Sequence, residues 1–265
     1  PPDRLIMASR SYYRRLGGAG RASLVASTDD TRSNWTREIQ HGSPPLALLT
    51  RAAEETLEPG MRIVRLTFDI LGPIPVAEVV VEARIVRPGR RICLVEAEMS
   101  AAGDSRPVAR LAAWALASSD TAEVAVDRHP PLVEGDAAEL SWQWQNPDGY
   151  LTTVDWRPQR AESGGAAVYW LRSLVGLVDD EPTTALQRLA MVVDAANGIG
   201  AVLDPQRFIY MNTDTTVHLH RYPGGADFGI RARASIGPDG IGVTTAEIFD
   251  TDGFVGTSAQ ALLVQ

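Results

Sequence analysis

An internal repeat constrains the fold of this chain more than any other feature of its sequence. Two blocks, residues 67–116 and 216–264, each contain four short runs of strand-forming residues separated by glycine-containing turn sequences. An offset of 149 residues aligns Phe68 with Val217, and the alignment slips by one residue at the last run. Such a repeat predicts two copies of one structural unit, each built from antiparallel strands.

One helix is expected before each strand block. In the first half, Ser43 suits the N-cap, Pro44 suits the first helical position, and apolar and small residues follow at helical spacing. In the second half, the stretch from 189 to 200 has the same character. An antiparallel sheet that wraps one long apolar helix is the hotdog arrangement. We therefore expect an α+β protein with two tandem hotdog domains, a double hotdog.

The repeat also sets the expected domain limits. The N-terminal hotdog domain is predicted at 1–117 and the C-terminal one at 148–265, and the polar, proline-containing segment 118–147 is predicted to link them. Isolated hotdog sheets leave a face and an edge open to further contacts, so a homo-oligomer is expected.

The composition excludes several classes of function. A net charge of −8 argues against nucleic acid as the main partner. All 25 basic residues are arginines, so lysine chemistry is excluded, and a phosphate held by a side-chain cation must be held by arginines such as Arg90, Arg91 or Arg221. No run approaches the roughly 18 apolar residues of a membrane span, and no signal peptide is recognised. We therefore expect a cytoplasmic protein without a membrane span.

Cysteine and histidine patterns favour structural roles. Cys93 lies in the apolar run 92–95 and is expected to be a buried thiol, because reactive cysteines need an open, electropositive setting. His218 and His220 project from one strand face at a spacing that suits a metal pair, but a polar sheet surface is the favoured interpretation and no metal is expected. His41 precedes the first helix and is expected to cap it or to contact a ligand.

Four motifs occur in order along the chain: QHGSPPLALL at 40–49, VDAANG at 193–198, NTDTTVHLHR at 212–221 and SAQAL at 258–262. Together they resemble the type II family of double-hotdog acyl-CoA thioesterases, and the thioesterase-like proteins of actinobacteria most of all. The resemblance covers nearly the whole chain apart from the predicted linker. It implies hydrolysis of a fatty acyl-CoA thioester to the free acid and coenzyme A by an activated water, with coenzyme A as part of the substrate and no separate cofactor.

In that family an Asp on the second helix, a Thr at the start of the next strand and a Gln on the last strand hold the attacking water. The resemblance places Asp194 and Gln260 at two of these positions and Asn212 at the Thr position, which departs from the pattern. The role is then kept by Asn212, shifted to Thr213 or Thr215, or lost. Independently of the resemblance, a carboxylate in a helix that packs on a sheet is costly unless it has partners or a task.

The repeat register predicts one site per chain. The three site positions correspond in the first half to residues that are apolar, so the polar set is confined to the C-terminal half. The N-terminal hotdog would then be structural and would contribute side chains to the acyl pocket. The first-half counterparts are Pro45, Ile63 and Ala112.

Structural explanations compete with these assignments. Asp194 could pair with an arginine, Gln260 could bond a neighbouring backbone group, and strand alternation would place Asn212 on a polar face with Asp214. Two other functions also stay open: a non-catalytic hotdog protein that binds acyl-CoA or lipid, and a hotdog hydratase or dehydratase. The latter needs a histidine with a carboxylate at the pocket mouth, so His41 facing Asp194 across a cleft would favour it.

Overall fold

The computed structural model describes residues 10–19, 22–133, 135–140, 147–160, 165–201 and 203–265. Its helices and strands occur in the order β1 (Ser11–Ala19), β2 (Ala22–Ser27), α1 (Ser43–Glu55), β3 (Met61–Ile70), β4 (Glu78–Arg87), β5 (Ile92–Ala101), β6 (Pro107–Ala117), β7 (Val154–Pro158), β8 (Ala167–Ser173), β9 (Gly176–Val178), α2 (Ala185–Val193), α3 (Ala196–Gly200), β10 (Tyr210–Asn212), β11 (Asp214–Leu219), β12 (Phe228–Ile236), β13 (Ile241–Asp250) and β14 (Gly253–Val264). Short 3-10 helices occur at Asp29–Thr31, Ala122–Val124 and Gly149–Thr153.

The strands form one 14-stranded sheet in the order β7-β8-β12-β13-β14-β11-β3-β6-β5-β4-β2-β1-β9, with β10 paired to β14. The six strands on either side of the β11–β3 junction follow the same order, which confirms the predicted repeat. At the junction Thr216 pairs with Thr67, and these residues are themselves 149 positions apart. The two halves are therefore related by a pseudo-two-fold axis at this pair, and the double hotdog is confirmed.

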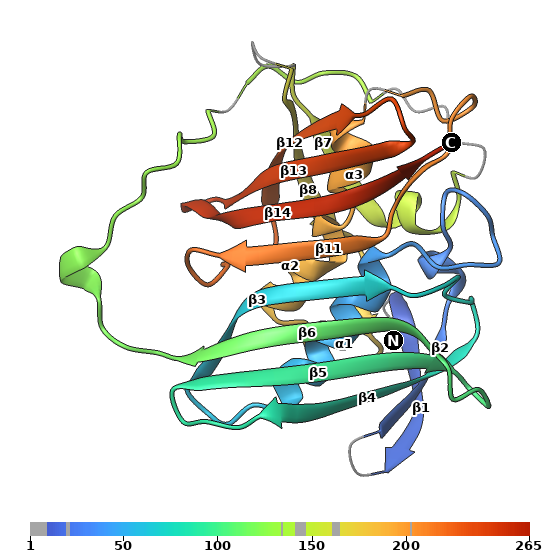
Figure 1. Ribbon diagram of the computed structural model, residues 1–265, viewed down its shortest axis with the longest axis vertical. Helices are drawn as coiled ribbons and strands as arrows, with labels where there is room; N and C mark the ends of the chain where they lie inside the picture. The colour runs from blue at the N-terminus through green and yellow to red at the C-terminus, as the bar shows by residue number, and fades with distance from the viewer. Residues whose placement is uncertain (1–9, 20–21, 134, 141–146, 161–164, 202) are drawn as a thin grey trace, which may run out of the picture.

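The helices lie behind the central strands, where the sheet wraps them (Figure 1). α1 and α2 pack side by side and antiparallel: Glu54 near the end of α1 accepts a hydrogen bond of 2.7 Å from Gln187 in the first turn of α2. Their apolar faces, with Leu46, Leu49 and Leu189 fully buried, fill the core. Antiparallel packing brings the start of α1 next to the end of α2, and this placement defines the site.

The sheet curls until its ends approach each other. β9 follows β8 closely in the chain, yet it pairs in parallel with β1 at the opposite end of the strand order. All four strands of each repeat block are at their predicted places, whereas β1, β2 and β7 to β9 were not predicted. These extra strands carry the sheet around the helix pair.

Two details of the predicted helices are wrong. Gly42, and not Ser43, occupies the N-cap of α1, and Ser43 is its first residue. The second helix does not run unbroken to 200 but ends at Val193. The main-chain oxygen of Asp194 accepts a hydrogen bond from Gln260, and the Gly198 amide that a continuous helix would direct to it bonds the Asn197 side chain. The side chain from β14 thus replaces a helical bond and breaks the helix.

Part of the predicted linker 118–147 lies outside the described residues, namely 134 and 141–146. The described part leaves β6 and runs along one side of the molecule to the C-terminal half (Figure 1). There the His129 ring stacks on Phe254 at 3.7 Å between centroids, and Arg231 donates to the Pro130 oxygen at 3.0 Å. The domain limits at 117 and 148 stay predictions.

Candidate active site

Asp194 is a buried carboxylate at the end of α2, with 2% of its surface exposed. Its Oδ1 atom accepts a hydrogen bond of 2.5 Å from the Thr215 hydroxyl and one of 2.8 Å from the Asn212 side-chain amide. Thr215 belongs to β11 and Asn212 to β10, so three elements meet at this oxygen. These donors offset part of the cost of burying a carboxylate.

Gln260 on β14 completes the cluster. Its Nε2 atom donates to the Asp194 main-chain oxygen and to the Thr215 hydroxyl, at 2.9 Å in both cases. A main-chain oxygen can only accept, so this contact fixes the orientation of the Gln260 amide. The Thr215 hydroxyl donates to Asp194 and accepts from Gln260 and, at 3.2 Å, from Asn212, which uses its full capacity. The Oε1 atom of Gln260 is buried and has no hydrogen-bond partner among the described residues.

The structure therefore brings Asp194, Asn212 and Gln260 together, as the sequence analysis predicted. It also adds Thr215, one of the two threonines to which the family's threonine role could shift. The other, Thr213, directs its hydroxyl to Asp214 instead, at 3.4 Å. The competing explanation that Asp194 pairs with an arginine is wrong, because no salt bridge to an arginine involves it within the described chain. Gln260 does bond a backbone oxygen, and that oxygen belongs to Asp194 itself.

Strand alternation misplaced Asn212. β10 ends at Asn212 and β11 begins at Asp214, so the alternation that would put both residues on one polar face is interrupted between them. Residues three positions apart on a regular strand point to opposite faces, but because of this interruption Asn212 and Thr215 both point to Asp194. Asn197 extends the cluster by donating to Asn212 Oδ1 at 3.3 Å.

Burial raises the pKa of Asp194 above its ordinary value, although the hydrogen bonds from Thr215, Asn212 and Gln260 act in the opposite direction. A carboxylate with a raised pKa is a stronger base once it is ionised. Perturbed ionisation of this kind at a cavity wall is typical of catalytic groups.

The second carboxylate oxygen of Asp194 faces the start of α1. No described residue donates a hydrogen bond to Oδ2, and a Cβ atom placed on Gly42 would lie only 2.3 Å from it. Any other residue at 42 would therefore displace the carboxylate. The two oxygens of Asp194 thus differ: Oδ1 is held by the cluster, and Oδ2 is directed to the gap between the two helices.

His41 lies beside the same oxygen, with its Nδ1 atom 3.9 Å from Asp194 Oδ2. The contact is not an ion pair: Nδ1 accepts a hydrogen bond of 3.1 Å from the Ser43 amide, and burial lowers the pKa of His41 to about 3. Through this bond His41 holds the amide of the first residue of α1, which agrees with capping, one of the two roles predicted for it. The ring also stacks on Tyr150, with centroids 3.8 Å apart and planes 9° from parallel.

A cavity of about 500 Å³ opens at this cluster. Both halves of the chain contribute to it, as expected for a pocket that the N-terminal hotdog helps to form. Its polar wall includes His41, Asp194 and Asn212. Its apolar wall includes Trp35, Ile39 and Ile74 from the first half and Leu151, Trp156 and Ile199 from the second. A large, mostly apolar pocket with a few converging polar groups is the usual form of a small-molecule site.

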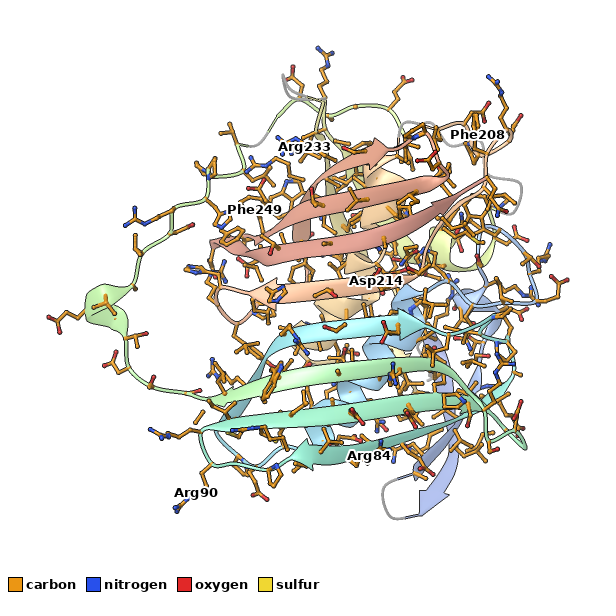
Figure 2. The ribbon with its side chains drawn as sticks, viewed as in Figure 1. Arg84, Arg90, Phe208, Asp214, Arg233 and Phe249 are labelled. Atoms are coloured by element: carbon orange, nitrogen blue, oxygen red, sulfur yellow. The ribbon has the colours of Figure 1, made fainter. Side chains whose placement is uncertain are left out.

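The proposed phosphate-binding arginines do not lie at this cavity. None of its described lining residues is an arginine. Arg90 projects from the turn between β4 and β5, at the far end of the sheet from Asp214, which follows the cavity residue Thr213 (Figure 2). Arg221 forms a salt bridge with Asp250.

The other residues considered in the sequence, Cys93 and His218, do not line the cavity. Cys93 is buried, as predicted, and burial raises the pKa of its thiol. His218 lies on β11 and is exposed, consistent with the favoured sheet-surface interpretation. No group of three His, Cys, Asp or Glu side chains in the described part of the chain is arranged to hold a metal ion. Likewise, no helix there is long and apolar enough to cross a membrane.

Comparison with protein families matches both halves of the chain. Residues 31–116 match the profile described as the acyl-CoA thioesterase N-terminal domain, and residues 126–264 match the acyl-CoA thioesterase C-terminal domain. Together the two matches include every residue of the cluster. A comparison with curated proteins gave no match.

Several solved structures share the fold. A Thermobifida fusca YX protein provisionally described as a thioesterase II is 17% identical, with 98% of this chain and 99% of that chain covered and a TM-score of 0.72. A hotdog-fold protein from Alicyclobacillus acidocaldarius is 18% identical, with 94% and 95% covered and a TM-score of 0.67. The acyl-CoA thioesterase II TesB2 of Mycobacterium marinum is 13% identical, with 96% and 94% covered and a TM-score of 0.68.

Proposed function

The chain belongs to the acyl-CoA thioesterase family, and we propose that it hydrolyses a fatty acyl-CoA to the free acid and coenzyme A. The observation that carries this proposal is the buried Asp194 carboxylate at the wall of a largely apolar cavity, with one oxygen held by Thr215 and Asn212 and the other without a hydrogen-bond donor among the described residues. Thioester hydrolysis needs a base for water and an apolar site for the acyl chain, and this arrangement provides both.

In the proposed reaction, water enters between Asp194 Oδ2 and the thioester. Its oxygen forms a bond to the carbonyl carbon while one of its protons passes to Oδ2. The tetrahedral intermediate then collapses, the carbon–sulfur bond breaks, and the proton on Asp194 passes to the departing thiolate. Thr215, Asn212 and Gln260 keep the carboxylate in place throughout, because their hydrogen bonds go to Oδ1 and to the main-chain oxygen of the same residue.

The start of α1 favours the negative charge that develops on the carbonyl oxygen. The dipole of this 13-residue helix is positive at its start. The Ser43 amide is taken by His41 Nδ1, and Pro44 and Pro45 carry no N–H group, so the donor that the start of the helix offers is the Gly42 amide. Preorganised donors at a developing oxyanion typically contribute about 10²- to 10³-fold to kcat each.

Release of free thiol from acyl-CoAs of graded chain length tests the proposal. We expect turnover by the wild type and a loss of at least about a hundredfold in kcat for Asp194→Asn and for Gln260→Ala. Glu54→Gln is the matched control, because Glu54 is a carboxylate at the other end of the helix pair, bonded to Gln187 and Tyr222. If the wild type binds acyl-CoA but releases no thiol, the protein is instead a non-catalytic acyl-CoA-binding protein.

One observation favours a second candidate, a hotdog hydratase or dehydratase. His41 and Asp194 do lie together at the cavity, as such an enzyme requires. A hydratase histidine, however, must take up a proton, and the Nδ1 lone pair of His41 is already used by the Ser43 amide. Hydration of a 2-enoyl-CoA without release of thiol would identify this second activity.

A further inference from the structure

We propose that His41 is a further catalytic residue of this site, whose Nε2–H group donates a hydrogen bond to the carbonyl oxygen of the thioester while the ring stays neutral. This inference rests on the thioester hydrolysis proposed above. It gives the N-terminal half, which lacks counterparts of Asp194, Asn212 and Gln260, a direct part in the chemistry.

The hydrogen bonding of His41 determines where its proton lies. The Ser43 amide can only donate, so Nδ1, 3.1 Å away, must accept and carries no proton. A neutral imidazole has one N–H group, which is then on Nε2. Nε2 has no hydrogen-bond partner among the described residues, and the side chain is 13% exposed where it lines the cavity. The ring therefore offers a single donor that no group in the described part of the chain uses.

The ring is also held rigidly. It stacks on Tyr150, whose hydroxyl is fixed by a hydrogen bond of 2.9 Å to the Met191 oxygen in α2. The His41 amide in turn donates to the Thr31 oxygen at 2.8 Å. A donor whose ring is stacked on a fixed neighbour and whose main chain is hydrogen-bonded loses little freedom when substrate binds, which is the condition for effective oxyanion stabilisation.

The surroundings of His41 keep the ring neutral. Burial lowers its pKa to about 3, even though the Asp194 carboxylate lies 3.9 Å from Nδ1. The stacked neighbour Tyr150 also stays uncharged, because burial raises its pKa well above the ordinary value. A neutral imidazole can polarise a substrate carbonyl, and it leaves Asp194 unpaired and able to act as a base. A charged ring would instead form an ion pair with that carboxylate and weaken it as a base.

Two substitutions separate catalysis from helix capping. In His41→Asn the side-chain oxygen replaces Nδ1 as acceptor for the Ser43 amide, but no donor replaces Nε2. In His41→Gln the longer amide places a donor near the Nε2 position. We expect kcat to fall about a hundredfold in His41→Asn with KM within about twofold, and to recover at least about tenfold of that loss in His41→Gln. Equal rates for His41→Asn and wild type, or equal loss in both variants, would overturn the inference.

The proton position has its own readout, which needs no activity. In protein labelled with ¹⁵N-histidine, the imidazole signals that disappear in His41→Gln should show an N–H group on Nε2 alone between pH 5 and pH 9. A proton on Nδ1, or a doubly protonated ring at pH 6, would contradict the assignment.

A non-hydrolysable ligand distinguishes failure of this inference from failure of the proposed function. The probe is an acyl-CoA analogue in which a methylene group replaces sulfur, with a ¹³C-labelled ketone carbonyl. On the wild type its carbonyl stretch should shift to lower frequency, and His41→Asn should remove most of that shift. The shift without any thioester turnover would overturn the hydrolase and keep the donor. Normal turnover with a shift unaltered by His41→Asn would overturn the donor and keep the hydrolase.

Discussion

The Thr215 hydroxyl donates to Asp194 Oδ1 across 2.5 Å and so joins the start of β11 to the end of α2. The family resemblance places the threonine role at 212, but in this chain Asn212 and Thr215 both bond the same oxygen. Although residue 212 is not a threonine, the Asp194 carboxylate therefore still receives the hydrogen bond of a threonine hydroxyl. This geometry agrees with a catalytic role for Asp194.

Removing the Thr215 hydroxyl should impair both activity and stability. Thr215→Val keeps the shape of the side chain but leaves Gln260 Nε2 with one acceptor fewer and Asp194 with one donor fewer. We expect a destabilisation of about 1–3 kcal/mol in urea unfolding and a loss of kcat of about tenfold or more. Thr216→Val is the control. Thr216 is the next residue on β11, so its side chain points to the opposite face of the sheet, and its substitution should change neither stability nor kcat. Full activity in Thr215→Val would remove Thr215 from the site.

Adding one methyl group at Gly42 should abolish turnover. In Gly42→Ala the new Cβ atom would fall 2.3 Å from Asp194 Oδ2, so the carboxylate must move. We expect a cost of about 1–3 kcal/mol in folding stability. The loss of kcat should be much larger than the unfolded fraction can explain, because the folded variant itself is inactive. Gly17→Ala is the control, because nothing lies within 4 Å of a Cβ atom at that position. A fully active Gly42→Ala enzyme would show that Oδ2 is not the reactive oxygen.

The raised pKa of Asp194 predicts a stability difference that depends on pH. Because the folded state binds the proton of Asp194 more tightly than the unfolded state, the stabilisation from protonated Asp194 is complete below the unfolded pKa. It is lost as pH rises through the folded pKa. Asp194→Asn does not titrate, so its stability relative to wild type should increase between pH 3 and pH 7. Urea titrations at both pH values measure this, and a fall in the stability of Asp194→Asn relative to wild type from pH 3 to pH 7 would contradict the direction of the shift.

Filling the apolar wall should shorten the acyl chains that the enzyme accepts. Leu151 and Ile199 line the cavity, and Ile199→Trp would occupy part of its volume. We expect kcat/KM to fall for long-chain acyl-CoAs and to change little for short ones. The control Val243→Trp alters an exposed side chain on β13. An unchanged chain-length profile in Ile199→Trp would mean that the acyl chain lies elsewhere.

The repeat made most of the fold predictable. Strand periodicity and the 149-residue offset are local properties of the chain, and they correctly gave the eight repeat strands and the relation between the halves. The resemblance then selected Asp194 and Gln260, which the fold brings together from α2 and β14. β1 and β7 were missed because their identity as strands depends on pairing with distant partners rather than on a repeated pattern.

The site itself was only partly predictable, because it depends on how the halves pack. His41 and Gly42 reach Asp194 only through the antiparallel packing of α1 against α2, which no local pattern specifies. The bend at Thr213 interrupts the strand, so Asn212 and Thr215 point the same way, and regular strand alternation could not predict that. Gly42, directly before Ser43 and Pro44 at the start of the first helix, was the available sign of a close approach.

The most direct test of the account is hydrolysis of a 2-enoyl-CoA in ¹⁸O-water, followed by mass analysis of the products. One substrate here offers both the thioester and the double bond to an activated water. Attack at the carbonyl, as the Asp194 geometry predicts, releases coenzyme A and places the label in the carboxyl group of an unsaturated acid, and Asp194→Asn abolishes this product. A labelled 3-hydroxyacyl-CoA with the thioester intact would contradict the account and identify His41 and Asp194 as a hydratase pair.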